Sequence, residues 1–262
     1  MPALTLPLRY VPHRTPPDLP CEESAFHYRT LERDLPIAQT ALVMVDCWDL
    51  HPIGSHERLT AQMMRERLKP VLDACRRLGM TVVHAPSPPQ AKHYPQWTHF
   101  AGPDELGMTP PAPPPDWPPE AFRRREGEFA PFARPKEPRD EVWRTQFAER
   151  RRIADVLGPE PGDFVVATGE QLHRLLRHRQ ILHLLYAGFA TNICVLYRDY
   201  GTRAMAARGY NVVLLRDCTL GIEMAETFAD QTETRAAILS IETLTGFSTT
   251  GEALLAACET AG

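Results

Sequence analysis

The stretch Gly188-Phe-Ala-Thr-Asn-Ile-Cys194 decides how this chain is interpreted. It follows the apolar run from Ile181 to Ala187 and leads directly into a helical pattern, which predicts a strand-to-helix turn that carries a thiol. If Thr191 caps this helix, Cys194 lies in the first helical turn, where unpaired backbone N–H groups and the positive end of the helix dipole favour a thiolate over a thiol. Cys194 is therefore the candidate nucleophile. The structural alternative is a small buried hydrophobic residue in a tight turn.

On both sides of this stretch, short β-rich apolar runs alternate with helical periodicity, which is typical of parallel βαβ units. Strands are predicted at residues 41–46, 81–85, 163–168, 182–187, 211–216 and 245–249, and helices near residues 57–78, 170–179, 192–208, 223–243 and 250–258. The predicted fold class is α/β, a three-layer α/β/α arrangement around a six-stranded parallel sheet. Ligands of such sheets bind beyond the carboxyl ends of the strands. Asp46 and Cys194 both follow a strand there, although Asp46 could also serve only as a cap or hydrogen-bond anchor.

The chain is expected to divide into an extended N-terminal arm, residues 1–40, and an α/β domain, residues 41–262, with an insertion at residues 86–138. The insertion holds 15 of the 26 prolines, which excludes a sheet interior. Its aromatic residues interleave with the cluster Arg123-Arg-Arg125, so we expect a packed lid, binding loop or interface arm rather than a disordered tether. The arginine cluster either steers an anionic substrate or is a solvated surface, and the second interpretation is favoured.

Composition excludes several classes of protein. The 262 residues are 43% hydrophobic and carry a formal net charge of −4, which argues against a nucleic-acid partner. No apolar run of about 18 residues marks a membrane span. The six cysteines lack CxxC spacing, which argues against a zinc ribbon or a disulfide scaffold. We expect a cytoplasmic protein, without a membrane or nucleic-acid partner, that acts on a small molecule.

Three segments together resemble the isochorismatase-like cysteine hydrolase superfamily. They are Val43-Met-Val-Asp46, Ala187-Gly-Phe-Ala-Thr-Asn-Ile-Cys-Val195 and Arg203-Ala-Met-Ala-Ala-Arg-Gly-Tyr-Asn-Val-Val-Leu-Leu-Arg-Asp217. The resemblance covers most of the chain and implies the strand order 3-2-1-4-5-6. It also implies hydrolysis of amide or related C–N bonds by a Cys, Asp and Lys triad, no cofactor, and assembly as a homo-oligomer. Cys194 and Asp46 match two triad positions, as nucleophile and as acid/base.

The third position of this pattern departs from the family. Its lysine follows the third strand, whereas here Thr168 stands at that point and the next helix begins at once. Lys92, Lys136 or His84 could substitute, or nothing does. A surface role for the two lysines and a structural role for the histidine are the favoured interpretations. If nothing replaces the lysine, the alternative function is a catalytically silent protein that binds a small molecule or a partner at this site.

The resemblance also implies how the substrate is held. The backbone N–H groups of residues 190–194 would form the oxyanion hole, aided by a cis peptide that we expect between Phe189 and Ala190. Trp48, His84, Phe189 and Ala190 are the predicted substrate-binding residues. Asp49, His51 and His56 form a ligand-like trio, but the zinc-bearing amidases of the superfamily place their motif after the second strand, so no metal is predicted and a metal hydrolase remains a third possibility.

Overall fold

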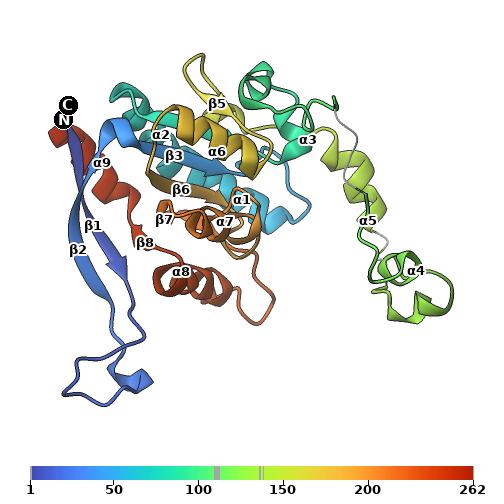
Figure 1. The fold of residues 1–262 in the computed structure, drawn as a ribbon, viewed down its shortest axis with the longest axis horizontal. Helices are drawn as coiled ribbons and strands as arrows, with labels where there is room; N and C mark the ends of the chain where they lie inside the picture. The colour runs from blue at the N-terminus through green and yellow to red at the C-terminus, as the bar shows by residue number, and fades with distance from the viewer. Residues whose placement is uncertain (1, 109–112, 136, 138, 262) are drawn as a thin grey trace.

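The computed structural model describes residues 2–108, 113–135, 137 and 139–261, and a single sheet runs through its body (Figure 1). The strand order is β2-β1-β8-β7-β6-β3-β4-β5. The parallel strands are β3 (Thr40–Val45), β4 (Thr81–Ala85), β5 (Phe164–Val165), β6 (His183–Phe189), β7 (Asn211–Leu220) and β8 (Phe247–Thr249). From β5 to β8 their order is the 3-2-1-4-5-6 expected from the resemblance, which confirms that prediction.

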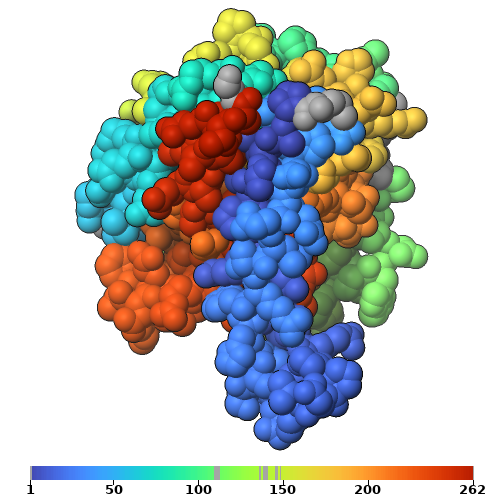
Figure 2. Space-filling model, turned by 90° about the vertical axis from the view of Figure 1, so that its left-hand side faces the viewer, coloured from blue at the N-terminus to red at the C-terminus, as the bar shows by residue number. Residues whose placement is uncertain are grey.

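The sheet has eight strands, so the predicted number of six is wrong. Two further strands, β1 (Ala3–Tyr10) and β2 (Arg29–Pro36), form an antiparallel hairpin from the N-terminal residues that were expected to run extended. β1 joins the edge of the sheet through the pairing of Arg9 with Ser248, and its alternating leucines, Leu4, Leu6 and Leu8, enter the core. The far end of the hairpin projects beyond the body of the molecule (Figure 2).

Helices cover both faces of the sheet, as the three-layer prediction requires (Figure 1). One face packs against α1 (Gly54–Met63), η3 (Met64–Leu68), α2 (Lys69–Arg77) and α9 (Gly251–Ala261). The other packs against α6 (Gly169–His178), η8 (Thr191–Val195), α7 (Thr202–Ala207) and α8 (Thr232–Leu244). The central strands β3, β4 and β6 are buried on both faces, which explains their predominantly apolar sequences.

Two predicted helices have different bounds. The helix expected at residues 223–243 begins only at Thr232, because the Glu223 carboxylate folds back to accept the N–H groups of Glu233 and Thr234. The helix expected at residues 192–208 is broken between η8 and α7. There the Asp199 carboxylate accepts the Gly169 N–H at the start of α6, and Gly201 closes a turn onto the Arg198 carbonyl.

The connection between β4 and β5 contains the proline-rich insertion and forms two parts. The first, with α3 (Pro88–Ala91) and η4 (Pro95–Phe100), packs on the body through Trp97, Phe100 and the Glu105–Arg174 ion pair. The second, with α4 (Glu120–Arg124) and η5 (Gly127–Phe132), projects at one end of the molecule (Figure 1). α5 (Arg139–Val142), η6 (Trp143–Ala148) and η7 (Asp155–Leu157) lead back to the sheet. The insertion is therefore packed only in its first part.

Candidate active site

The two reacting candidates, Asp46 and Cys194, meet at the carboxyl ends of the central strands. Asp46 directly follows β3, and Cys194 lies in the short helix after β6. The two strands pair in register up to Val45 and Gly188. A Cβ atom at Gly188 would lie 2.0 Å from the Val45 carbonyl oxygen, and its φ is +116°, so only glycine permits this close approach.

A cluster of polar side chains holds the Asp46 carboxylate, which is buried. The Ser87 hydroxyl donates to its Oδ1 at 2.8 Å, and Arg198 Nη2 lies 3.5 Å from its Oδ2. The same Arg198 nitrogen donates to Ser87 Oγ at 2.7 Å, and the Tyr200 hydroxyl is 3.5 Å from Oδ1. Burial raises the pKa of Asp46 above its ordinary value of 3.8, while Arg198, Cys194 and Ser87 oppose this shift. A carboxyl group with a raised pKa is suited to accept and return a proton.

The Cys194 thiol is partly buried and is neutral at rest. Burial and the neighbouring Asp46 carboxylate together raise its pKa to about 12, because Arg198 only partly offsets both effects. The expectation that the helix end favours a thiolate is therefore wrong. Thr191 does not cap the helix, because its hydroxyl is bonded to that of Thr219. The short helix η8 stabilises the thiolate form of Cys194 less than desolvation destabilises it.

Backbone donors surround the sulfur. The helix η8 begins at Thr191, and the first N–H groups of a helix have no acceptor in a preceding turn, although that of Ile193 is bonded to the Ala190 carbonyl. The peptide between Phe189 and Ala190 is cis, which confirms that prediction. Free N–H groups beside a nucleophile are the donors that an oxyanion requires.

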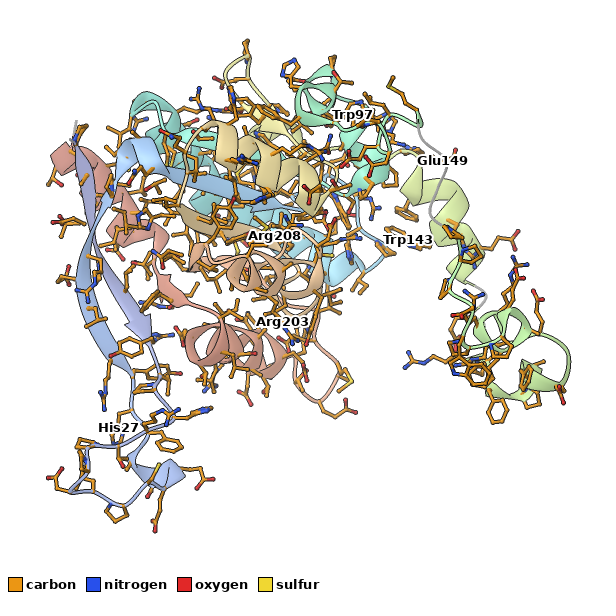
Figure 3. All side chains as sticks on the ribbon, in the orientation of Figure 1. His27, Trp97, Trp143, Glu149, Arg203 and Arg208 are labelled. Atoms are coloured by element: carbon orange, nitrogen blue, oxygen red, sulfur yellow. The ribbon has the colours of Figure 1, made fainter. Side chains whose placement is uncertain are left out.

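A cavity of about 350 Å³ opens beside this pair. Three of the predicted substrate-binding residues, Trp48, Phe189 and Ala190, line it together with Asp46 and Cys194. Its remaining lining residues are His51, His56, Thr60, Trp143, Ile193 and Ile222. Trp143 comes from η6 and lies where the projecting part of the β4–β5 connection meets the body (Figure 3). The long connection thus contributes one wall of the site.

The structure places the fourth predicted substrate-binding residue, His84, outside this cavity. Its side chain points to the α2 face of the sheet, where Nε2 lies 3.0 Å from Asp163 Oδ2, and Asp163 is also ion-paired with Arg76. Burial lowers the pKa of His84. His84 therefore does not join Asp46 and Cys194, because its side chain is held within the sheet's α2 face by Asp163 rather than lying beyond the end of the strands.

We expect Asp163→Asn to lower the free energy of unfolding by about 2 kcal/mol at pH 7. Burial alone would raise the pKa of Asp163, but bonds from His84, Arg76 and the Glu160 N–H lower it from 3.8 to about 2. The ionised form therefore stabilises the fold above pH 3.8, and this contribution is lost as the pH falls towards 2. Urea unfolding at pH 7 and at pH 3 measures the change.

The matched control for this prediction is Asp73→Asn, which removes a partly exposed pair with Lys69 and should cost less than about 1 kcal/mol. A stability loss of equal size at both pH values would contradict the assignment to the Asp163 charge.

No lysine of the described residues replaces the family lysine. Lys92 is exposed and lies over the Trp97 ring at 5.7 Å, and Lys69 pairs with Asp73. Lys136 lies outside the described residues. The Thr168 side chain instead caps α6 by accepting the Gln171 N–H, which explains why the chain enters that helix immediately.

The histidines near the cavity form no metal site with Asp49. The Asp49 carboxylate accepts the Arg152 N–H, while the His51 and His56 rings lie 4.6 Å apart. Burial lowers the pKa of His56 to about 4, and that of His51 is lowered as well, so both are neutral at pH 7. Within the described residues, no group of three or more His, Cys, Asp and Glu side chains is arranged to hold a metal ion.

Sequence reasoning missed three site residues, namely Ser87, Arg151 and Arg198. Arg198 follows Cys194 by four positions and donates its N–H to the Cys194 carbonyl, so helical spacing was the available signal. Ser87 sits at a φ of +79° inside a Pro-Ser-Pro sequence that suggested only a loop. Arg151 comes from a segment after the insertion, which the bridge between Trp48 and Ile153 brings next to the cavity, where the Arg151 guanidinium carbon lies 3.5 Å from the centroid of the Trp48 ring.

None of the helices within the described part of the chain has the length and hydrophobicity that crossing a membrane requires.

Comparisons with known proteins agree on one family. A family model of the isochorismatase domain matches residues 40–245. The ureidoacrylate amidohydrolase RutB of Enterobacter sp. (strain 638) is 35% identical over 108 residues, which cover 38% of this chain and 42% of that protein. The match thus spans less than half the length of RutB. A solved cysteine hydrolase from Pseudomonas syringae pv. phaseolicola 1448A superposes with a TM-score of 0.57 at 16% identity, over 87% of this chain and 96% of that one.

Proposed function

Because the chain belongs to the isochorismatase family, we propose that it is a cysteine-dependent hydrolase of a small amide-like or carbamoyl compound. The observation that carries this proposal is the placement of Cys194 and Asp46 together on the wall of one cavity. The relative with 35% identity is named an amidohydrolase, which supports cleavage of a C–N bond as the reaction class.

In the proposed reaction, the Cys194 sulfur attacks the carbonyl carbon while Asp46 takes the thiol proton. A raised thiol pKa requires such a base, because almost no thiolate is present beforehand. The resulting oxyanion would accept hydrogen bonds from N–H groups at the start of η8. Asp46 then donates its proton to the leaving nitrogen as the C–N bond breaks, which leaves a thioester on Cys194.

Water completes the cycle. Asp46 removes a proton from water as the water oxygen attacks the thioester carbon, and the C–S bond then breaks. The proton returns to the sulfur and the acid product leaves, so the enzyme is regenerated without a cofactor. A homo-oligomeric, cytoplasmic enzyme remains part of this proposal by family analogy.

Arg198 takes the role of the family lysine in this proposal. Its guanidinium lies beside both Asp46 and Ser87. Burial would lower its pKa, but Asp46, Tyr200 and Cys194 together raise it, so the group remains cationic. The catalytically silent alternative depends on the absence of a cation at the position of the family lysine. In this proposal, the Arg198 guanidinium provides a cation beside Asp46.

We expect Arg198→Met to reduce kcat/KM by about 100-fold, because removing a group that stabilises charge in the transition state typically lowers the rate by about this factor. Arg198→Lys should restore part of the loss, because it keeps the positive charge. The assay is ammonia release from a panel of primary amides and N-carbamoyl compounds. Arg203→Met is the matched control, because Arg203 is exposed on α7 and contacts only the Tyr197 ring among the interactions described. Unchanged turnover in Arg198→Met would refute its role. No turnover of any panel member by the unaltered enzyme would favour the silent alternative.

A further inference from the structure

We propose that the acyl half of the substrate carries an uncharged aliphatic chain, which extends from the catalytic cavity past His56 and Ile222 into a second cavity beside it. This proposal rests on the proposed function, because it names the substrate class of the same site. The second cavity has a volume of about 260 Å³ and lies between the start of α1 and the segment that follows β7.

The two cavities adjoin at two side chains. His56 and Ile222 line both of them, so a ligand that passes these side chains reaches from one cavity into the other. The position of Ile222 is fixed relative to the catalytic helix η8. There Asn192 Nδ2 donates to the Ile222 carbonyl and Asn192 Oδ1 accepts the Ile222 N–H, both at 2.9 Å. The second cavity is therefore held next to the helix that carries Cys194.

The volumes indicate that the second cavity holds part of a ligand. A pocket that binds a complete small molecule usually has a volume of about 300–1,000 Å³. The second cavity lies below this range, and the catalytic cavity, of about 350 Å³, lies at its lower end. Together the two cavities have the size of an ordinary substrate site.

The walls of the second cavity favour an apolar group. They include the side chains of Ile53, Leu59, Leu220 and Phe228. Of these four, Ile53, Leu59 and Phe228 are exposed, so apolar surface from two separate segments converges on one hollow without being buried. A hydrocarbon chain that covers this surface contributes the free energy of apolar burial.

The ionisable side chains among the described residues of this lining, Glu223 and His56, offer no partner to a charged group. Glu223 Oε1 accepts the Thr234 N–H and hydroxyl at 2.9 and 2.7 Å, and its Oε2 accepts the Glu233 N–H at 3.0 Å. The carboxylate thus caps the start of α8, where the helix dipole offsets its charge. His56 is neutral and bonded to the backbone of Gly221. An ionised group would lose its hydration here without a free partner of opposite charge.

The position of Asp46 assigns the chain to the acyl half of the substrate. In the proposed reaction, Asp46 gives its proton to the leaving nitrogen. Asp46 lines the catalytic cavity and is not part of the lining of the second one. The leaving nitrogen therefore stays in the catalytic cavity, and the group that extends past Ile222 belongs to the acyl half.

Binding to the Cys194→Ala variant tests this proposal without requiring turnover. Isothermal titration calorimetry would compare butanamide, heptanamide and 7-aminoheptanamide, which adds an ammonium group to the end of the longer chain. Each buried methylene group should tighten binding about 3-fold, so we expect heptanamide to bind at least about 20-fold more tightly than butanamide. The ammonium group should weaken binding at least about 10-fold relative to heptanamide.

Ala229→Trp in the same background should reduce the preference for heptanamide to less than about 3-fold, because Ala229 lines the second cavity and an indole would fill it. Phe228→Ser should lower the preference in the same direction by removing an apolar wall. Ala225→Trp, at an exposed position of the same segment, is the matched control and should keep the preference. Equal binding of the two amides, tighter binding of 7-aminoheptanamide, an unchanged preference in Ala229→Trp, or binding of no probe would overturn the proposal.

Sedimentation equilibrium distinguishes a substrate site from a contact between copies of the chain. If a second copy covered this hollow, Ala229→Trp would weaken association and the unaltered enzyme would show no preference for heptanamide, which would also overturn the proposal. In the active enzyme, kcat/KM for ammonia release should follow the order of binding. Preferential binding of heptanamide by Cys194→Ala without turnover by the unaltered enzyme would support the second cavity and refute the hydrolase proposal. Turnover of butanamide and heptanamide with equal kcat/KM would do the reverse.

Discussion

Replacing Cys194 with alanine is expected to lower kcat at least about 1,000-fold, because the variant lacks the atom that forms the covalent intermediate. The sulfur lies on the cavity wall together with the Asp46 carboxylate. Ammonia release under saturating substrate measures the loss. Mass spectrometry after a rapid acid quench should detect an acyl adduct on the unaltered enzyme and none on the variant.

Cys21→Ala is the control for general loss of a thiol, because Cys21 is an exposed cysteine near the end of the N-terminal hairpin. It should keep full activity. Activity of Cys194→Ala above about one tenth of the original would contradict covalent catalysis by this residue.

Asp46→Asn is expected to cost nearly as much, about 1,000-fold in kcat, because the amide keeps the shape of the carboxylate but cannot take the thiol proton. The resting thiol has a pKa of about 12, so attack without a base starts from a very small thiolate population. The unaltered enzyme should lose activity as the pH falls through the pKa of Asp46, which burial raises above 3.8, and the variant should lack this acid limb.

Asp49→Asn provides the matched control, since Asp49 follows the same strand but accepts only a backbone N–H, from Arg152, among its described bonds. Its activity should stay within about 3-fold of the original. An acid limb of equal position in Asp46→Asn would assign the titration to another group.

The parallel part of the sheet could be predicted because its central strands β3, β4 and β6 are buried on both faces and are predominantly apolar. The hairpin was missed for a different reason. Leu4, Leu6 and Leu8 alternate as a strand requires, but Pro7 and the prolines that follow suggested an extended arm, and the pairing of Arg9 with Ser248 connects positions far apart in the sequence.

For the candidate site, local motifs were sufficient for Asp46 and Cys194, since each follows a recognisable strand. The pKa of Cys194 could not be obtained in this way. This pKa depends on desolvation and on the carboxylate of Asp46, 148 positions away in the sequence, and these two effects outweigh the lowering expected from the helix end. Arg151 was equally out of reach, because it comes to the site through a bridge between Trp48 and Ile153, two residues on opposite sides of the long insertion.

The connection between β4 and β5 supplies Ser87, Trp143 and Arg151, while Asp46, Cys194 and Arg198 come from the central strands and the segment after β6. Ser87 ties the start of this connection to Asp46 and Arg198, whereas Trp143, near its far end, touches the cavity without a bond to either. A change in the length or sequence of this connection around Trp143 would therefore alter which small molecules fit the cavity, while Asp46, Cys194 and Arg198 keep their positions.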